Sequence, residues 1–217
     1  MLGSGPLGEY LKAGIAIFVL IDPIGAIPIY LSLTPTYTPS EHHRTVRRIA
    51  VATTLILLGS LAIGGPALEL LGVSIPAFRV AGGLLILLLA LGMMRAKPSS
   101  ARESEQEASE AAEKPDIAVV PMAIPMLSGP GAIGAMIVYG HMKATALNYA
   151  VLAAIAVVVG GSTWLALQLA APIGGRLGRT GVGLLTRIMG LLLAAIAVEM
   201  LANGLRDLFP ILGSSPR

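Results

Sequence analysis

Long apolar segments dominate this sequence and decide what kind of structure the chain can form. Residues 80–94 and 144–173 contain no charged side chain, and each is too long to be a strand of a soluble core. A helix that crosses the hydrocarbon core of a bilayer needs about 20 mainly apolar residues. Only 12% of the 217 residues are charged, which is too few to cover a soluble surface. The sequence therefore predicts an integral membrane protein.

Six apolar segments have the length of membrane-spanning helices. They are expected at Leu7–Leu33, Ile49–Leu71, Val73–Met94, Ile117–Gly140, Asn148–Ile173 and Gly183–Leu205. The polar segment 96–116, rich in glutamate, separates the third segment from the fourth and is expected to be a solvated linker. The predicted fold class is all-α, with six transmembrane helices in a single membrane domain that covers residues 1–217.

Basic residues indicate how these helices are oriented. Most Lys and Arg residues lie in the loops after the first, third and fifth segments, for example Arg44, Arg95 and Arg176. Cytoplasmic loops of membrane proteins carry an excess of Lys and Arg. We therefore expect a multi-pass protein of the cell membrane with the linker in the cytoplasm and both termini outside. The same asymmetry explains the net charge of +3, so no nucleic-acid partner is expected.

The first apolar segment is interrupted in its middle by Asp22-Pro23-Ile24-Gly25-Ala26. Asp followed by Pro is typical of a helix start, with Asp as the N-cap and Pro at the first helical position. The segment would then divide into Leu7–Ile21 and Pro23–Leu33. The second piece would be about 16 Å long, which places its start near the bilayer centre.

A second interruption, Ser128-Gly129-Pro130-Gly131-Ala132, lies in the fourth segment and follows Pro121 and Pro125. Gly25-Ala26-Ile27 matches Gly131-Ala132-Ile133, and Arg79-Val80-Ala81-Gly82-Gly83 near the start of the third segment matches Arg187-Ile188-Met189-Gly190-Leu191 in the sixth. The matches predict two three-helix repeats, 1–95 and 117–217. Because three is odd, the second repeat would be inverted, an architecture that recurs in secondary transporters. Chance similarity between helices rich in Gly and Leu is the alternative.

Two half-helix starts that meet at mid-membrane would suit a zwitterion. Their free N–H groups and positive dipole ends attract a carboxylate, and the unwound carbonyls before them can receive an ammonium. Glycine allows a close approach of the backbone to a ligand, although it also serves ordinary helix packing in membranes. The candidate substrate-binding residues are Asp22, Pro23, Ile24, Gly25, Ala26, Ser128, Gly129, Pro130, Gly131, Ala132 and Asn203.

Asp22 and Glu199 are the carboxylates placed deepest in apolar surroundings, and both are candidates for proton coupling. The alternatives are a purely structural cap for Asp22 and an interfacial position for Glu199. Arg79 and Arg187 are expected to reach the membrane surface with their long side chains, and substrate binding is the alternative. His42, His43 and His141 are expected in loops, without the partners that a metal site needs. The sequence has no cysteine and no catalytic or cofactor-binding motif, so neither an enzyme nor a cofactor is expected.

Together, Asp22-Pro23-Ile24-Gly25, the segment from Ile124 to Ile133 and Arg79-Val80-Ala81-Gly82-Gly83-Leu84 resemble the MarC family, which includes the SnatA-type small neutral amino-acid transporters. The resemblance covers essentially the whole chain. It implies a six-helix membrane protein that transports glycine, alanine and similar amino acids, driven by protons. Two other functions stay open, a channel-like pore and a cation or metal exporter that uses Asp22 and Glu199 as ligands. A homo-oligomer also stays open.

Overall fold

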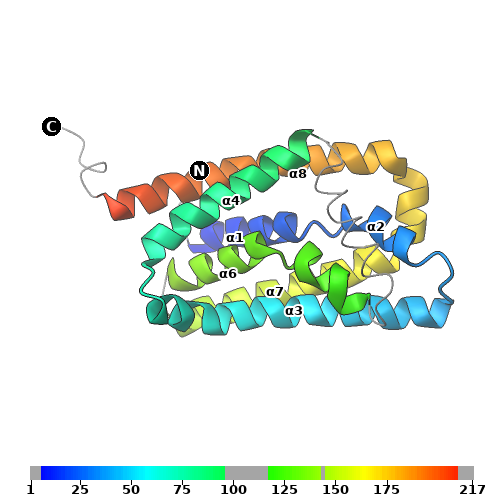
Figure 1. Ribbon diagram of the computed structural model, residues 1–217, viewed down its shortest axis with the longest axis horizontal. Helices are drawn as coiled ribbons and strands as arrows, with labels where there is room; N and C mark the ends of the chain where they lie inside the picture. Colours follow the sequence, from blue (N-terminus) through cyan, green and yellow to red (C-terminus); the bar gives the residue numbers. More distant parts are fainter. Residues whose placement is uncertain (1–5, 96–116, 143–144, 210–217) are drawn as a thin grey trace.

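The structure, a computed structural model, describes residues 6–95, 117–142 and 145–209 as a bundle of helices (Figure 1). No strand occurs within these ranges, which confirms the predicted all-α class. The elements are α1 (Pro6–Ile21), α2 (Ala26–Leu33), α3 (Pro39–Leu70), α4 (Ile75–Arg95), the π-helix η1 (Ala118–Leu127), α6 (Pro130–Met142), α7 (Ala146–Gln168) and α8 (Ala170–Leu208). The predicted linker 96–116 lies outside the described residues.

Five helical segments of the described chain are long and apolar enough to cross a membrane. They are Leu7–Leu33, Pro39–Leu70, Ile75–Arg95, Ala146–Gln168 and Thr180–Leu208. The remaining predicted span, the fourth, corresponds to η1 and α6, which are separated by Ser128 and Gly129. Large apolar side chains cover the outside of the bundle, with Leu55, Val158 and Leu191 each more than half exposed. This surface suits lipid rather than water, in agreement with a six-helix membrane protein.

Helix α3 begins well before its predicted boundary, ten residues before Ile49. Thr38 forms a capping box with Glu41: the Thr38 hydroxyl accepts from the Glu41 N–H, and the Glu41 carboxylate accepts from the Thr38 N–H. Pro39 then occupies the first turn, where its missing N–H costs nothing. Hydropathy detects only the apolar part of such a helix, so the polar first turns were missed.

This boundary corrects the expected places of the histidines. His42 and His43 lie in the first turns of α3 and His141 lies in the last turn of α6, so the prediction of loop positions was wrong. The fifth span was also predicted too long. Helix α7 ends at Gln168, and α8 then bends at Gly178, whose backbone is left-handed with φ of 58°.

Helices that occupy equivalent places in the two predicted repeats lie against each other. Contacts join α1 to α6, α3 to α7 and α4 to α8, and Figure 1 shows the two members of each pair running in opposite directions. The pair of α4 and α8 approaches most closely at glycines. A Cβ atom added at Gly83 would lie 3.2 Å from the Ala197 carbonyl oxygen, and one at Gly190 would lie 3.0 Å from that of Ala90. Inverted repeats require equivalent helices to run in opposite directions, as these do, but the repeat itself stays a prediction.

Candidate functional site

The first interruption is a tight turn between α1 and α2 rather than a simple helix start. Asp22 has left-handed backbone with φ of 44°, a conformation that Asp tolerates better than most residues. Its carboxylate accepts a hydrogen bond from the Gly25 N–H at 3.0 Å, and its carbonyl accepts from the Ala26 N–H at 3.1 Å. Helix α2 therefore begins at Ala26, three residues after the predicted start at Pro23. Asp22 caps this turn, and Gly25 occupies the N-cap position of α2.

Gly25 is fixed by this turn. A Cβ atom at position 25 would collide with the Asp22 carboxylate, so only glycine leaves room for the side chain that folds over it. The Ile27 N–H donates to the Ile24 carbonyl at 3.1 Å, and Pro28 has no N–H. The first N–H groups of α2 are thus already bonded within the turn, and this helix start does not offer them to a ligand.

The second interruption keeps its helix start open. The π-helix η1 runs to Leu127. In a π-helix each N–H bonds to the carbonyl five residues earlier, and the Ser128 N–H accordingly donates to the Ala123 carbonyl at 2.9 Å. Helix α6 begins at Pro130, the residue expected from the sequence. The Ile133 N–H bonds to the Gly129 carbonyl at 3.1 Å, so the N–H groups of Gly131 and Ala132 come before the first intrahelical bond.

Ser128 is the second polar feature of this interruption. Its side chain is only 1% exposed, and its hydroxyl has no hydrogen-bond partner within the described ranges. Leaving a buried hydroxyl unsatisfied costs about 1 to 3 kcal/mol. Such a group is expected where a ligand supplies the missing partner. The start of α6 therefore combines this hydroxyl with the N–H groups of Gly131 and Ala132 as possible donors to an anion.

The two interruptions lie close together near the middle of the bundle's long axis (Figure 1). Both α1 and α2 contact η1, and α1 contacts α6. A Cβ atom at Gly131 would lie 3.1 Å from a methyl group of Leu20 and 3.0 Å from one of Leu89. Side chains from α1 and α4 thus cover the start of α6 in this conformation.

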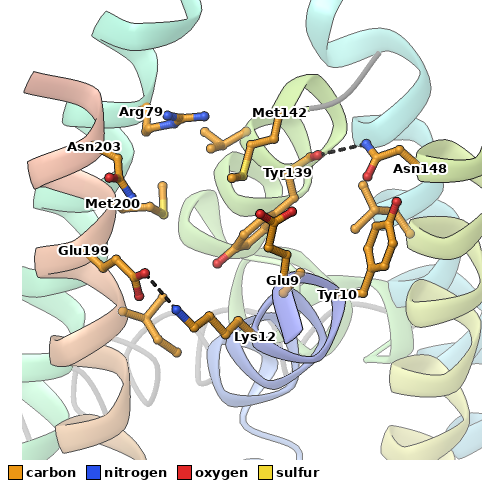
Figure 2. A pocket seen from close by; sticks show the side chains of 14 residues that line it. Glu9, Tyr10, Lys12, Arg79, Tyr139, Met142, Asn148, Glu199, Met200 and Asn203 are labelled. Carbon is orange, nitrogen blue, oxygen red and sulfur yellow. Dashed lines mark hydrogen bonds and ion pairs between the residues drawn. The ribbon is translucent and has the colours of Figure 1, made fainter. Parts of the chain in front are cut away.

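A cavity of about 210 Å³ lies away from the interruptions, at the end of the bundle where α1 begins and α8 ends (Figure 2). We call it the terminal cavity. Helices α1, α4, α6, α7 and α8 all contribute to it. Its walls carry both charged and polar side chains, among them Glu9, Lys12, Arg79, Tyr139, Glu199 and Asn203.

Two ion pairs organise the charged groups at this end. Lys12 Nζ lies 2.8 Å from Glu199 Oε1, and this pair joins α1 to α8 across the cavity. Arg79 Nη1 lies 2.7 Å from Asp207 Oδ2, which joins α4 to α8. The Arg79 side chain is 12% exposed, so it is held inside the bundle instead of reaching the membrane surface as expected.

Asn148 has a structural role beside the terminal cavity. Its buried side-chain amide donates to the carbonyls of Tyr139 at 3.1 Å and Gly140 at 3.0 Å, which are orphan acceptors at the end of α6.

We expect Asn148→Ala to lower the stability of the protein by about 1 to 3 kcal/mol, because two carbonyls lose their donor. The measurement is the melting temperature in detergent. Asn203→Ala, in the same cavity, is the control and should melt like the wild type. Equal melting of both variants and the wild type would contradict a capping role for Asn148.

The structure separates the predicted site residues into two groups. Asp22–Ala26 and Ser128–Ala132 lie together at the interruptions, whereas Glu199 and Asn203 line the terminal cavity. Nine residues separate Ala13 at the cavity from Asp22, about 14 Å along a helix. Glu199 therefore cannot reach the same ligand as Asp22 in this conformation.

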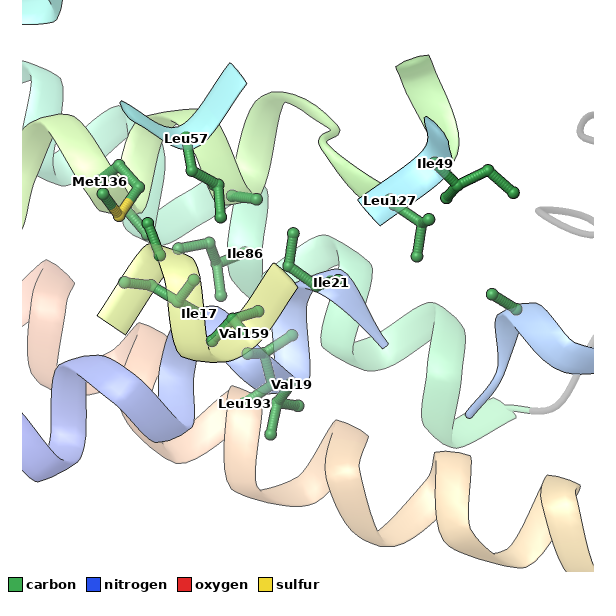
Figure 3. Close-up of a cluster of buried hydrophobic side chains, with 14 of the residues drawn as sticks. Ile17, Val19, Ile21, Ile49, Leu57, Ile86, Leu127, Met136, Val159 and Leu193 are labelled. Atoms are coloured by element: carbon green, nitrogen blue, oxygen red, sulfur yellow. The ribbon is translucent and has the colours of Figure 1, made fainter. Parts of the chain in front are cut away.

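A layer of apolar side chains fills the space between the two groups. Figure 3 shows Ile17, Ile86 and Met136 gathered in the core, with Leu193 beneath them, and each is at most 1% exposed. Ile17 is one turn deeper than Ala13 on α1, and Leu193 is nearly one turn deeper than Ile196 on α8. This apolar layer closes the route from the terminal cavity to the interruptions.

The described residues contain no group of three or more His, Asp or Glu side chains that would hold a metal ion. The terminal cavity was missed from the sequence because its residues come from five separate helices. Lys12 and Glu9 were the available signal, since they are charged residues inside the first apolar segment.

Comparison with known proteins gives one consistent result. A family described as "MarC family integral membrane protein" matches residues 7–209. The UPF0056 membrane protein YhcE of Escherichia coli is 35% identical, with 93% of this chain and 94% of that protein covered. The UPF0056 membrane protein YvbG of Bacillus subtilis is 37% identical, with 92% and 95% covered. No solved structure gives a significant match.

Proposed function

The chain belongs to the MarC family of integral membrane proteins, and from this premise we propose that it is a secondary active transporter of small neutral amino acids. Its substrates are glycine, alanine and amino acids of similar size, and uptake is coupled to protons by symport, as in the SnatA-type members that the sequence resembles. We place it in the cell membrane with both termini outside, on the distribution of Lys and Arg along the chain.

The observation that carries this proposal is the open start of α6 beside a second interrupted helix. The substrate carboxylate binds the N–H groups of Gly131 and Ala132 and the hydroxyl of Ser128, which is buried and unsatisfied within the described ranges. A helix start in a low-dielectric interior favours an anion through its N–H groups and its dipole. Discontinuous helices of transporters use the same arrangement for substrate carboxylates.

Asp22 supplies the opposite charge. Its carboxylate lies at the end of α1, in the turn that leads to α2. The same carboxyl group takes up the coupled proton, and when protonated it still accepts a hydrogen bond from the substrate ammonium through its carbonyl oxygen, so the proton and the substrate are carried together, as symport requires. Leu20, Leu89 and the apolar layer cover the site in the present conformation, so alternating access requires one repeat to rock against the other.

The test is uptake of labelled glycine into proteoliposomes under an imposed pH gradient. Uptake is expected to saturate, to exceed equilibrium when the gradient is present, and to collapse when a protonophore removes it. Unlabelled alanine should compete, and a large cationic amino acid such as arginine should not. Uptake that never saturates would instead favour a channel-like pore.

The same preparation tests the remaining alternative. A cation or metal exporter that uses Asp22 and Glu199 as ligands would bind divalent ions in calorimetric titrations. The separation of these two carboxylates by about three helical turns of α1 makes a shared ion unfavourable. Binding of a divalent ion that Asp22→Asn removes would support the exporter and contradict the amino-acid proposal.

A further inference from the structure

We infer that the terminal cavity is a separate binding site for the same zwitterionic amino acids, in which Arg79 receives the carboxylate and Glu199 receives the ammonium. This inference rests on the proposed function and adds a site to it. The interruptions contribute nothing to this cavity, and the apolar layer separates the two places.

Arg79 has an unused donor in a buried position. One nitrogen of the guanidinium, Nη1, is paired with Asp207, whereas Nε is buried and has no hydrogen-bond partner in the part of the chain that the structure describes. A guanidinium carries five N–H donors, and its Nε edge binds a carboxylate through two parallel hydrogen bonds. Figure 2 shows the Arg79 guanidinium extending from α4 toward Met142. The ion pair with Asp207 holds it there.

Glu199 lies on a different wall of the cavity and provides the negative charge. Its carboxylate pairs with Lys12, and both side chains are about half exposed, at 54% and 49%. An ion pair with this exposure contributes little stability, so a substrate ammonium can replace Lys12 at the carboxylate. Figure 2 shows the phenol of Tyr139 pointing toward this pair from α6.

The charges of the lining favour a zwitterion over an ion of either sign. Glu9 and Glu199 balance Lys12 and Arg79, so the four charged lining residues add up to zero. The two groups proposed to hold the ligand lie on different helices, Arg79 on α4 and Glu199 on α8. An anion would satisfy Arg79 alone, and a cation would satisfy Glu199 alone. A zwitterion satisfies both at once.

The cavity is large enough for a small amino acid. Its volume of about 210 Å³ exceeds the space that a few water molecules need. Apolar residues complete the lining, including Ala13, Val138, Leu152 and Met200. They accommodate a hydrogen, a methyl or a hydroxymethyl group at the α-carbon better than a charged side chain.

The experiment compares concentration dependence between variants in proteoliposomes, together with equilibrium binding of labelled glycine to the protein in nanodiscs. Arg79→Gln is expected to raise the half-saturating glycine concentration about 10- to 100-fold, because a charge-assisted carboxylate contact is lost. Arg79→Lys should recover only part of this affinity, since an ammonium cannot form the two-bonded contact. Arg187→Gln, at the matching position in the second predicted repeat, is exposed and should leave uptake unchanged.

Glu199→Gln provides a second test of the site, one that leaves the ion pair between Arg79 and Asp207 intact. The half-saturating glycine concentration of this variant is expected to rise about tenfold. If Arg79→Gln fails to fold, this variant decides the result. Half-saturation within twofold of the wild type for Glu199→Gln and for any folded Arg79 variant would overturn the terminal site and leave the proposed function standing. Absence of both binding and uptake in the wild type would remove the two together.

Discussion

Asp22→Asn is expected to abolish gradient-driven uptake of glycine while the protein folds normally. The Asn side-chain oxygen can still accept the Gly25 N–H, and Asn tolerates the left-handed backbone that Asp22 adopts. The variant therefore keeps the turn and loses only the charge. Losing a charged partner for the ammonium costs about 1.5 to 3 kcal/mol, which is about a 10- to 150-fold loss of affinity. The measurement is glycine uptake with and without a pH gradient.

Asp22→Ala distinguishes the role of the Asp22 charge from the role of Asp22 as a cap. It removes the cap as well as the carboxylate, so its melting temperature should also fall, by the equivalent of about 1 kcal/mol. The Asp22→Asn variant and the wild type should have the same melting temperature. Asp22→Asn with wild-type uptake and an unchanged response to the gradient would reduce Asp22 to a structural cap and refute its role in coupling.

Gly190→Ala is expected to destabilise the protein by forcing apart α4 and α8. The added Cβ would lie 2.9 Å from Met93 Cβ and 3.0 Å from the Ala90 carbonyl oxygen. These atoms belong to the backbone or are attached directly to it, so the helices themselves must separate. Overpacking of this kind costs about 1 to 3 kcal/mol, and the melting temperature of a chain this size falls by about 2 to 4 °C for each kcal/mol.

Gly183→Ala is the matched control, because it lies two turns earlier on α8 and an added Cβ there meets no atom within 4 Å. This variant should be as stable as the wild type or slightly more so, since Ala favours helix over Gly by up to about 1 kcal/mol. Thermal melting of both variants in the same detergent is the measurement. Equal melting of Gly190→Ala and Gly183→Ala would show that α4 and α8 are not packed through Gly190.

The helical class and the two interruptions were predictable because each depends on local sequence. Pro130 starts α6 where the sequence placed it, since proline is favoured in the first turn of a helix and disfavoured later. Hydropathy located the apolar parts of the spans for the same reason. The early start of α3 was missed because Thr38 and Glu41 act through a capping box in a polar stretch, to which hydropathy is blind.

The site was predictable only in part. Ser128 and Asp22 belong to local motifs, and their neighbours in the chain indicated their position in the fold. The sequence does not show that Asp22 satisfies the start of α2 while the start of α6 keeps unbonded N–H groups, because this asymmetry depends on the φ angle of a single residue. Arg79 was expected at the membrane surface, since its partner Asp207 is 128 residues away and no local pattern connects them.

Helix α3 gives the two sides of the membrane a direct mechanical connection. At one end, Tyr30 on α2 bonds through its hydroxyl to His42 Nδ1 of α3 at 2.8 Å. Near the other end, Gly64 and Gly65 leave room for Ile137 and His141 of α6. Both points belong to one helix of 32 residues, so a shift of α2 displaces the surface on which α6 rests. In the proposed alternating-access cycle, opening one side and closing the other would then be a single, reciprocal equilibrium, in which a change that favours either movement favours both.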